Sequence, residues 1–370
     1  MRVGLLIYGS LDTLSGGYLY DRKLVEYLRS QGDTVEIVSI PWRSYPRHLL
    51  DNFSADLQSR LERLQVDVLL QDELNHPSLF WLNNKLDLPY PVIAIVHHLR
   101  CSELRPDWQN QLYAWVERRY LRSVDGFVFN SHSTRQTVEA QGIETERHPW
   151  VLAYPAGSRF EKQPHPESAA IPDSTTIQQR ANQPGHLRLV FAGSLIARKG
   201  LHTLLDALAT IPAGLCELDI AGSPTVDPAY TRKVMQQVNW LGLKKIVRFH
   251  GALADGPLSA LFAQAHVMVT PSSYEGFGIV YLEGMSFGLP AIASNAGAAH
   301  EIITPDENGY LIEPENSTEL ALYLHRLARD RSLLARMSLA ARKRYESFPS
   351  WEQSAARIRE FLTTTSLQKR

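Results

Sequence analysis

The chain has 370 residues, 44% of them hydrophobic and 21% charged, and its formal net charge is −1. This length exceeds what one ordinary core holds and suits two domains, while the balanced charge gives no indication of nucleic-acid binding. The two cysteines, Cys101 and Cys216, are too few and too far apart for a disulfide framework or a cysteine metal cluster, so a reducing compartment is expected.

The first apolar run, residues 3–8, has the length of a strand, and no small-residue cleavage site follows it. No stretch approaches the roughly 20 apolar residues that cross a bilayer. We therefore expect a soluble, cytoplasmic protein, with peripheral contact at the inner face of a membrane as the alternative.

Short β-branched apolar runs alternate with helical patterns through the first half of the chain. Helices are predicted at 18–30, 108–122 and 133–141. Strands are predicted at 3–8, 34–40, 66–70, 92–96 and 126–129. This alternation is typical of a doubly wound parallel sheet.

The pattern breaks between about residues 161 and 186, which are rich in Pro, Gln, Ser and Asn and have no apolar period. Such a composition indicates an interdomain linker or a surface excursion. A second alternation follows, with helices predicted at 201–210, 229–241, 257–265 and 279–287 and strands at 187–192, 216–221, 246–250, 267–270, 290–294 and 310–312.

The predicted fold class is therefore α/β, with two doubly wound Rossmann-like domains facing a cleft. Expected limits are 1–180 for the first domain with its linker, 181–346 for the second domain and 347–370 for a C-terminal helix. That helix has an apolar face that includes Trp351 and Ile358, so we expect it to pack back on the first domain. Ligands of open parallel sheets bind beyond the carboxyl ends of the strands.

The strongest motif lies in such a loop, after the strand predicted at 267–270. Glu275 and Glu283 are separated by seven residues, and a helix is expected to begin near Gly278 between them. A helix N-terminus offers unpaired N–H groups and a positive dipole to an anion, and carboxylates accept pairs of sugar hydroxyls. A nucleotide sugar has that layout of hydroxyls, diphosphate and hydroxyls. The plain alternative is a helix cap with a solvent-facing glutamate.

These residues resemble the retaining family-4 glycosyltransferases, which have the two-domain GT-B fold, and the resemblance is strongest over residues 187–313. It implies an acceptor-side first domain and a second domain that binds the nucleotide-sugar donor. It also implies that Glu275 contacts the transferred sugar and Glu283 the ribose. The loop residues expected to bind the donor are Gly276, Phe277, Gly278 and Ile279. The family more often has two glycines in the later small-residue turn, where this chain has only Gly297.

A second motif, Arg198-Lys199-Gly200, follows the strand predicted at 187–192. A cation at the mouth of a strand suits a diphosphate. Lys199 matches the family pattern, but Ser194 occupies the position where the family usually has an arginine. Arg198 either compensates for that loss or belongs to a solvated basic turn.

Two further candidates lie in the first half. Gly16 and Gly17 follow the first strand, where glycines let backbone N–H groups approach a phosphate or a sugar. A glycine pair is otherwise a plain turn. His97 follows the strand predicted at 92–96 and matches a histidine that the family often has there. It either binds a sugar hydroxyl or has a structural role, bonding a loop carbonyl.

The resemblance implies a hexosyltransferase that retains configuration and acts on a hydroxyl of a glycan or a lipid-linked acceptor. No cofactor is expected besides the nucleotide-diphosphate sugar, and no metal, because no Asp, Glu and His cluster near the motifs has ligand spacing. The catalytic residues would be Glu275, Lys199 and His97. The alternatives are another GT-B enzyme, such as an epimerase or a phosphorylase, or a protein that only binds sugar nucleotides. A dehydrogenase is disfavoured because no Gly-x-Gly-x-x-Gly follows the first strand.

The segment 326–370 holds eleven Lys or Arg against four Asp or Glu, a net charge of +7. Such a segment is usually a solvated face, and contact with anionic lipid is the alternative.

Overall fold

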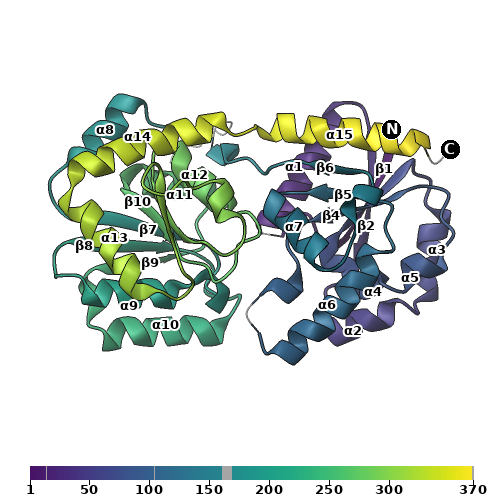
Figure 1. Ribbon diagram of the computed structural model, residues 1–370, viewed down its shortest axis with the longest axis horizontal. Helices are drawn as coiled ribbons and strands as arrows, with labels where there is room; N and C mark the ends of the chain where they lie inside the picture. The colour runs from purple at the N-terminus through teal and green to yellow at the C-terminus, as the bar shows by residue number, and fades with distance from the viewer. Residues whose placement is uncertain (14, 104, 161–168, 369–370) are drawn as a thin grey trace. The chain divides into compact units, whose positions relative to one another are not determined.

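The computed structural model describes residues 1–13, 15–103, 105–160 and 169–368. The chain divides into two compact units, one formed by Met1–Pro155 with Pro349–Arg370 and the other by Ala156–Phe348. Each unit is built on a parallel sheet of six strands (Figure 1). Both sheets have helices on their two faces, so the predicted pair of doubly wound domains is confirmed.

The first unit has the strand order β2-β1-β3-β4-β5-β6. Its strands are β1 (Arg2–Tyr8), β2 (Thr34–Ile40), β3 (Val68–Asp72), β4 (Val92–Val96), β5 (Gly126–Phe129) and β6 (Trp150–Leu152). Strand β3 begins two residues later than predicted, after Asp67 has bonded the carbonyl of Arg2. Strand β6 was not predicted, because three half-buried residues at a sheet edge have no clear alternation.

Alternate residues of these strands point into two separate cores. On one face Leu5 and Ile7 pack with α1 and α15, and on the other Leu6 and Tyr8 pack with α3 and α4. The helices of this unit are α1 (Gly16–Ser30), α2 (Tyr45–Asp51), α3 (Ala55–Arg63), α4 (His76–Leu79), α5 (Leu82–Lys85), α6 (Asp107–Leu121), α7 (His132–Ala140) and α15 (Trp351–Gln368). The short helices α2 to α5 were not predicted, since four to nine residues give too few turns for a helical period.

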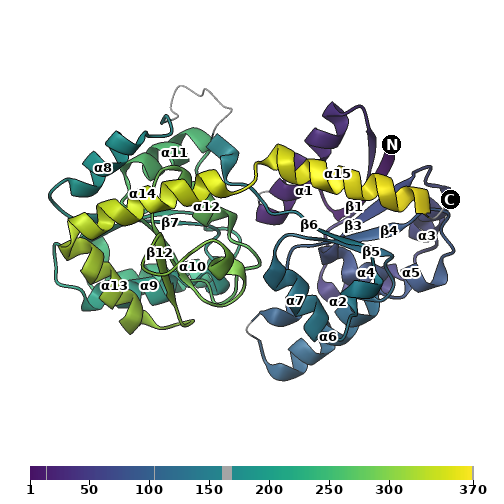
Figure 2. The ribbon, with the colours of Figure 1, turned by 45° about the horizontal axis from the view of Figure 1, so that its top comes forward.

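The C-terminal helix belongs to the first unit, as predicted. Figures 1 and 2 both show α15 beside α1. Trp351 contacts the edge of the Tyr20 ring, and Ile358 is buried in the core that α1 shares with the sheet. Arg359 also forms an ion pair with the buried carboxylate of Asp33, at 2.6 Å.

The second unit has the strand order β12-β11-β10-β7-β8-β9. Its strands are β7 (Leu187–Ala192), β8 (Cys216–Ala221), β9 (Val247–Gly251), β10 (Val267–Thr270), β11 (Ala291–Ser294) and β12 (Gly309–Ile312). Its helices are α8 (Ser174–Asn182), α9 (Leu201–Thr210), α10 (Pro228–Trp240), α11 (Asp255–Gln264), α12 (Ile279–Ser286), α13 (Ser317–Arg329) and α14 (Arg331–Ser347). Each predicted strand and helix of this half is present, within two residues at either end.

The segment expected to be a linker is partly helical and groups with the second unit. Residues 161–168 lie outside the described part of the chain, but Asp173 caps α8, which packs on α14. Arg180 of α8 donates to the carbonyls of Ala263 and Phe287. These bonds place the boundary after Pro155 rather than near residue 180. They join residues far apart in sequence, so local composition could not reveal them.

Among the described residues, no helix combines the length and the apolarity that crossing a membrane requires.

Candidate functional site

In the second unit, the loops that follow β7 and β10 bring the predicted cations and the first glutamate together. The Nζ atom of Lys199 lies 2.6 Å from Oε2 of Glu275, and the Ser272 hydroxyl donates to the same oxygen at 3.1 Å. Arg198 is more distant from this carboxylate, at 3.7 Å, because its Nη1 donates to the Tyr274 carbonyl at 2.7 Å. Lys199 is therefore the main partner of Glu275, and Arg198 braces the loop that carries it.

Glu275 and Lys199 determine each other's pKa. Burial alone would raise the pKa of Glu275, but Lys199 and Arg198 lower it to about 2. Burial lowers the pKa of Lys199, and Glu275 opposes that effect. The carboxylate is thus ionised at neutral pH, and it keeps a desolvated ammonium beside it.

The main chain of Glu275 is held by the turn after β11. The Glu275 carbonyl accepts from Ala298 N at 2.9 Å, and Glu275 N donates to Ala296 O at 3.2 Å. Gly297 between them has a φ of 86°, and a Cβ added there would lie 2.0 Å from the Glu275 carbonyl oxygen. The single glycine of this turn is therefore required for the close approach of two chain segments. Sequence reasoning left its role open.

The residues between the two glutamates form the entrance to helix α12. Gly278 is its N-cap and has a φ of 93°, as expected for a residue without Cβ. Phe277 is buried and meets the Phe348 ring edge-on, with ring centroids 6.1 Å apart. Gly276 lies in the same loop, and Ile279 is the first residue of the helix. The predicted helix start between the glutamates is present, with its free N–H groups at the carboxyl end of β10.

Glu283 lies within α12 and is buried, with an ion pair that the sequence did not reveal. Its Oε1 is 3.6 Å from Nη1 of Arg159, whose other nitrogens bond Oδ1 of Asp255 at 2.5 and 2.9 Å. Burial raises the pKa of Glu283, while Arg159 opposes the rise. Arg159 and Asp255 are functional candidates missed at first, since neither is near Glu283 in the chain.

The remaining predicted residues belong to the first unit. Gly16 and Gly17 begin α1, where the Ser15 hydroxyl accepts from Tyr18 N at 3.3 Å. A Cβ on Gly17 would lie 3.2 Å from Cδ2 of His97. The absence of a side chain at Gly17 thus allows the start of α1 to approach the imidazole, so the structure brings the glycine pair and His97 together.

His97 is buried between carboxylates. Its Nε2 is 3.3 Å from Oδ1 of Asp21, and ligand atoms of His97, Asp21 and Asp72 lie within 4.8 Å of one another. Burial would lower the pKa of His97, but Asp21 and then Asp72 raise it to about 9. Burial and Asp21 raise the pKa of Asp72 well above its usual value. At neutral pH His97 is therefore an imidazolium, and it offers donors rather than a base.

A second group in this unit, Glu73, His76 and Glu117, also has the spacing of a cation site. Both oxygens of the Glu73 carboxylate are buried without a hydrogen bond, whereas the ligand atoms of His76 and Glu117 have partners. His76 is bonded through Nδ1 to the Glu73 carbonyl and through Nε2 to the Tyr45 hydroxyl. The Glu117 carboxylate accepts from the backbone N–H groups of Arg100 and Cys101. This group therefore stabilises the loops after β3 and β4.

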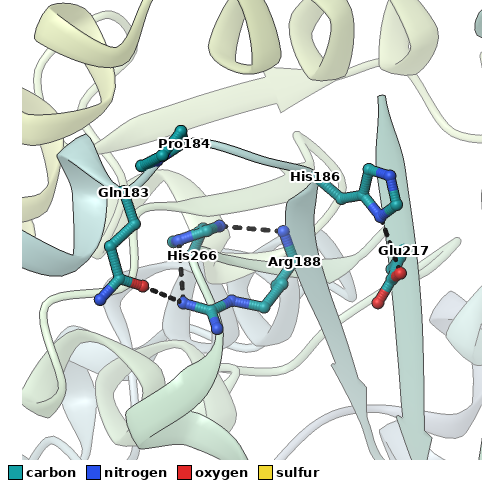
Figure 3. A pocket seen from close by; sticks show the side chains of 6 residues that line it. All are labelled: Gln183, Pro184, His186, Arg188, Glu217 and His266. Carbon is teal, nitrogen blue, oxygen red and sulfur yellow. Dashed lines mark hydrogen bonds and ion pairs between the residues drawn. The ribbon is translucent and has the colours of Figure 1, made fainter. Parts of the chain in front are cut away.

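A polar pocket of the second unit lies at the amino ends of its strands, opposite the carboxyl ends that carry Lys199 and Glu275. Figure 3 shows its lining residues, among them His186 and Arg188 at the start of β7 and Glu217 at the start of β8. Desolvation and Arg188 lower the pKa of His266 in this pocket to about 3. Its side chains bond one another at the amino ends of the strands, away from Lys199 and Glu275, so it is not the predicted site.

Two family descriptions match most of the chain. Residues 173–344 match the glycosyl transferases group 1, and residues 15–150 match the glycosyl transferase 4-like domain. A phosphatidyl-myo-inositol mannosyltransferase of Mycobacterium leprae is 25% identical over 402 residues, which cover 99% of this chain and 97% of that protein.

The MMP alpha-(1->4)-mannosyltransferase of Mycolicibacterium hassiacum is 29% identical over 272 residues, or 72% of this chain. The alignment covers 64% of that relative's own length, and the alignments with two further curated relatives cover 42% and 57% of theirs. A sucrose-phosphate synthase from Thermosynechococcus elongatus has a TM-score of 0.81 over 98% of both chains, and at 20% identity this likeness concerns the fold. The chain therefore belongs to the family-4 glycosyltransferases of the glycosyl transferases group 1, and it has their GT-B fold.

Proposed function

We propose that this glycosyltransferase moves a hexosyl unit from a nucleoside-diphosphate sugar to a hydroxyl of a glycan or lipid-linked acceptor, with retention of configuration. The observation that carries the proposal is the buried group of Lys199 and Glu275 beside the N-terminus of α12. It offers a cation and free N–H groups for the diphosphate and an ionised carboxylate for the sugar. Two relatives named as mannosyltransferases support a sugar donor of this kind.

In the proposed reaction the acceptor oxygen attacks the anomeric carbon on the face from which the diphosphate leaves. The bond from that carbon to the phosphate oxygen breaks, its electron pair remains on the phosphate, and the phosphate takes the acceptor proton. Glu275 orients the sugar, while Lys199 and the α12 N-terminus stabilise the growing negative charge on the phosphate. Glu283 binds the ribose hydroxyls. In the first unit, His97 as an imidazolium and the N–H groups near Gly16 and Gly17 would supply hydrogen-bond donors suited to a sugar or a phosphate.

We expect turnover without a divalent metal, because an ammonium and a helix N-terminus already face the diphosphate in this proposal. The test is a panel of nucleoside-diphosphate hexoses, screened by thermal shift and then assayed for transfer and hydrolysis with EDTA present. The proposal predicts turnover of at least one donor with an α-configured product from an α-configured sugar. Binding without turnover would favour a sugar-nucleotide sensor. Conversion of the donor sugar without transfer would favour an epimerase. Activity that EDTA abolishes and magnesium restores would indicate a metal-dependent enzyme.

Arg159 provides a prediction about pH. Without its guanidinium, Glu283 would be buried beside Asp255 alone, so its pKa should rise further and a larger fraction of the carboxyl should be protonated as the pH falls. A protonated carboxyl is a weaker acceptor for ribose hydroxyls. Arg159→Ala should therefore lose nucleoside-diphosphate affinity as the pH falls from about 8 to about 6, more steeply than the unmodified protein.

Isothermal titration across that pH range measures this effect, with Arg159→Lys as the variant that keeps the charge and should restore a flatter profile. Arg342 of α14 bonds the Ser286 carbonyl of α12 and the Glu346 carboxylate, and it is unchanged in these variants. Parallel pH profiles for Arg159→Ala and the unmodified protein would contradict the role assigned to Arg159.

A further inference from the structure

The outer face of α6 in the first unit exposes an unusual set of side chains. Trp108, Leu112 and Trp115 follow one another at helical spacing, and they are 66%, 47% and 50% exposed. Arg119 and Arg122 continue the same stripe and are also exposed. The stripe is therefore apolar and aromatic at one end and cationic at the other.

Neighbouring loops extend this stripe into a surface. Phe53, after α2, and Trp81, between α4 and α5, are 73% and 46% exposed, and their ring centroids are 6.2 Å apart. The Arg119 guanidinium lies 5.4 Å from the Trp81 ring and 5.7 Å from the Trp115 ring. We call Phe53, Trp81, Trp108, Leu112, Trp115 and Arg119 the aromatic surface. Figure 1 shows α2, α4 and α6 together on the side of the sheet opposite α15.

The chemistry of the aromatic surface fits a lipid headgroup region. Tryptophan prefers the boundary between water and hydrocarbon, and arginine among tryptophans can keep its charge at that boundary. Close to these residues in the chain, Arg47, Lys85 and Arg122 are exposed cations, and Asp56, Asp87 and Asp107 are exposed carboxylates. With Arg119, the cations outnumber the carboxylates. Contact with a second copy is less suitable, because a two-fold interface centred on Arg119 would bring the arginines of both copies together.

The basic segment 326–370 is a poorer candidate for lipid contact. Its guanidinium groups mostly bond the protein's own carbonyls and carboxylates, so they are not available to headgroups. Examples are Arg326 with Asp306, Arg331 with the Gly185 carbonyl, Arg342 with the Ser286 carbonyl, Arg344 with the Glu301 carbonyl and Arg359 with Asp33.

We infer that the aromatic surface docks the first unit on a bilayer that contains anionic lipids. The tryptophans and Phe53 enter the headgroup region, and Arg119 with the other exposed cations binds the negative headgroups. The binding is peripheral and reversible, it needs neither donor nor acceptor, and it would keep a membrane-borne acceptor within reach of the enzyme.

Co-sedimentation with vesicles tests this inference on the full chain, without any sugar nucleotide. Binding should be strong to phosphatidylcholine vesicles that contain phosphatidylglycerol and weak to phosphatidylcholine alone. Trp115→Ala should lower the partition coefficient by roughly tenfold. Arg119→Gln should lower it by about fivefold in anionic vesicles, and the loss should disappear in high salt.

The second unit offers matched control positions on α10. Trp240→Ala removes a tryptophan that is 84% exposed, and Arg232→Gln removes an exposed arginine, so both should bind vesicles like the unmodified protein. Thermal unfolding of each variant checks that the fold is retained. Equal losses at α6 and α10, or no binding to anionic vesicles, would overturn the inference. Self-association that Trp115→Ala abolishes, without vesicle binding, would assign the surface to a second copy instead.

Discussion

Glu275→Ala is expected to lower kcat by roughly 10²-fold or more, while the affinity for the free nucleoside diphosphate stays nearly intact. Glu275 would contact the transferred sugar, so its loss misplaces the reacting carbon even when the donor is bound. The free nucleotide has no sugar for it to contact. The structure adds that Glu275 partners Lys199 at 2.6 Å. Removal of the carboxylate lowers the pKa of Lys199 further, but the negative charge of a bound diphosphate then opposes that effect in its place, so nucleotide binding is largely preserved.

Glu283→Ala should show the opposite division of effects. The ribose does not react, so hydrogen bonds to it contribute equally to the ground state and the transition state. A charged hydrogen bond is worth roughly 1.5–3 kcal/mol, which corresponds to a rise of about ten- to hundredfold in donor KM and in nucleotide Kd together. Arg159 keeps its two bonds to Asp255 in this variant, so no charged group is left without a partner.

Calorimetric titration of both variants with the nucleoside diphosphate, beside steady-state kinetics with the donor, separates these outcomes. Glu275→Gln is a useful third variant, because it keeps the shape and some hydrogen bonding but removes the charge. A loss of nucleotide affinity in Glu275→Ala with none in Glu283→Ala would mean that the two roles are exchanged.

Lys199→Ala should lower turnover by roughly 10²-fold or more, because it removes the cation that faces the developing charge on the diphosphate. It should also change the ionisation of the site. Glu275 would be buried with Arg198, at 3.7 Å, as its remaining cationic partner, so its pKa should rise above its value of about 2. The residual activity should therefore fall at acidic pH, and a pH profile of kcat measures this second effect.

Arg198→Ala is the matched control, since it removes a cation from the adjacent position. Its Nη1 bonds the Tyr274 carbonyl, and the Arg198 carbonyl accepts from Ser273 N, so its side chain mainly braces the loop. We expect a smaller loss of turnover than for Lys199→Ala, accompanied by a lower melting temperature. A larger loss of turnover in Arg198→Ala would transfer the phosphate role to Arg198.

The sheets of both units could be predicted because their strands are buried on both faces. Runs such as Val92–Val96 and Val267–Thr270 are apolar throughout, and helices with a clear apolar period separate them. The edge strand Trp150–Leu152 and the helix Ser174–Asn182 escaped prediction. Their structure depends on pairing and packing with distant segments rather than on their own pattern.

The candidate site divides in the same way. Glu275, Lys199 and the helix start near Gly278 were visible because they are local motifs after predicted strands. The ion pair of Arg159 and Glu283 joins residues that are 124 positions apart in the chain. The pair of Asp21 and His97 joins residues that are 76 positions apart. Neither pair has a spacing that a single sequence can reveal, so the charges of Glu283 and His97 could not be predicted.

The path of the chain through the two units determines the order in which they can be completed during synthesis. The second unit is a continuous insert of residues 156–348, whereas the first unit is made from both ends of the chain. Its core includes Ala355, Ile358 and Leu362, and its buried Asp33 is neutralised partly by Arg359. On the ribosome the first unit, although its first 155 residues are translated first, therefore remains without part of its core until the last helix emerges. The second unit can be complete before it.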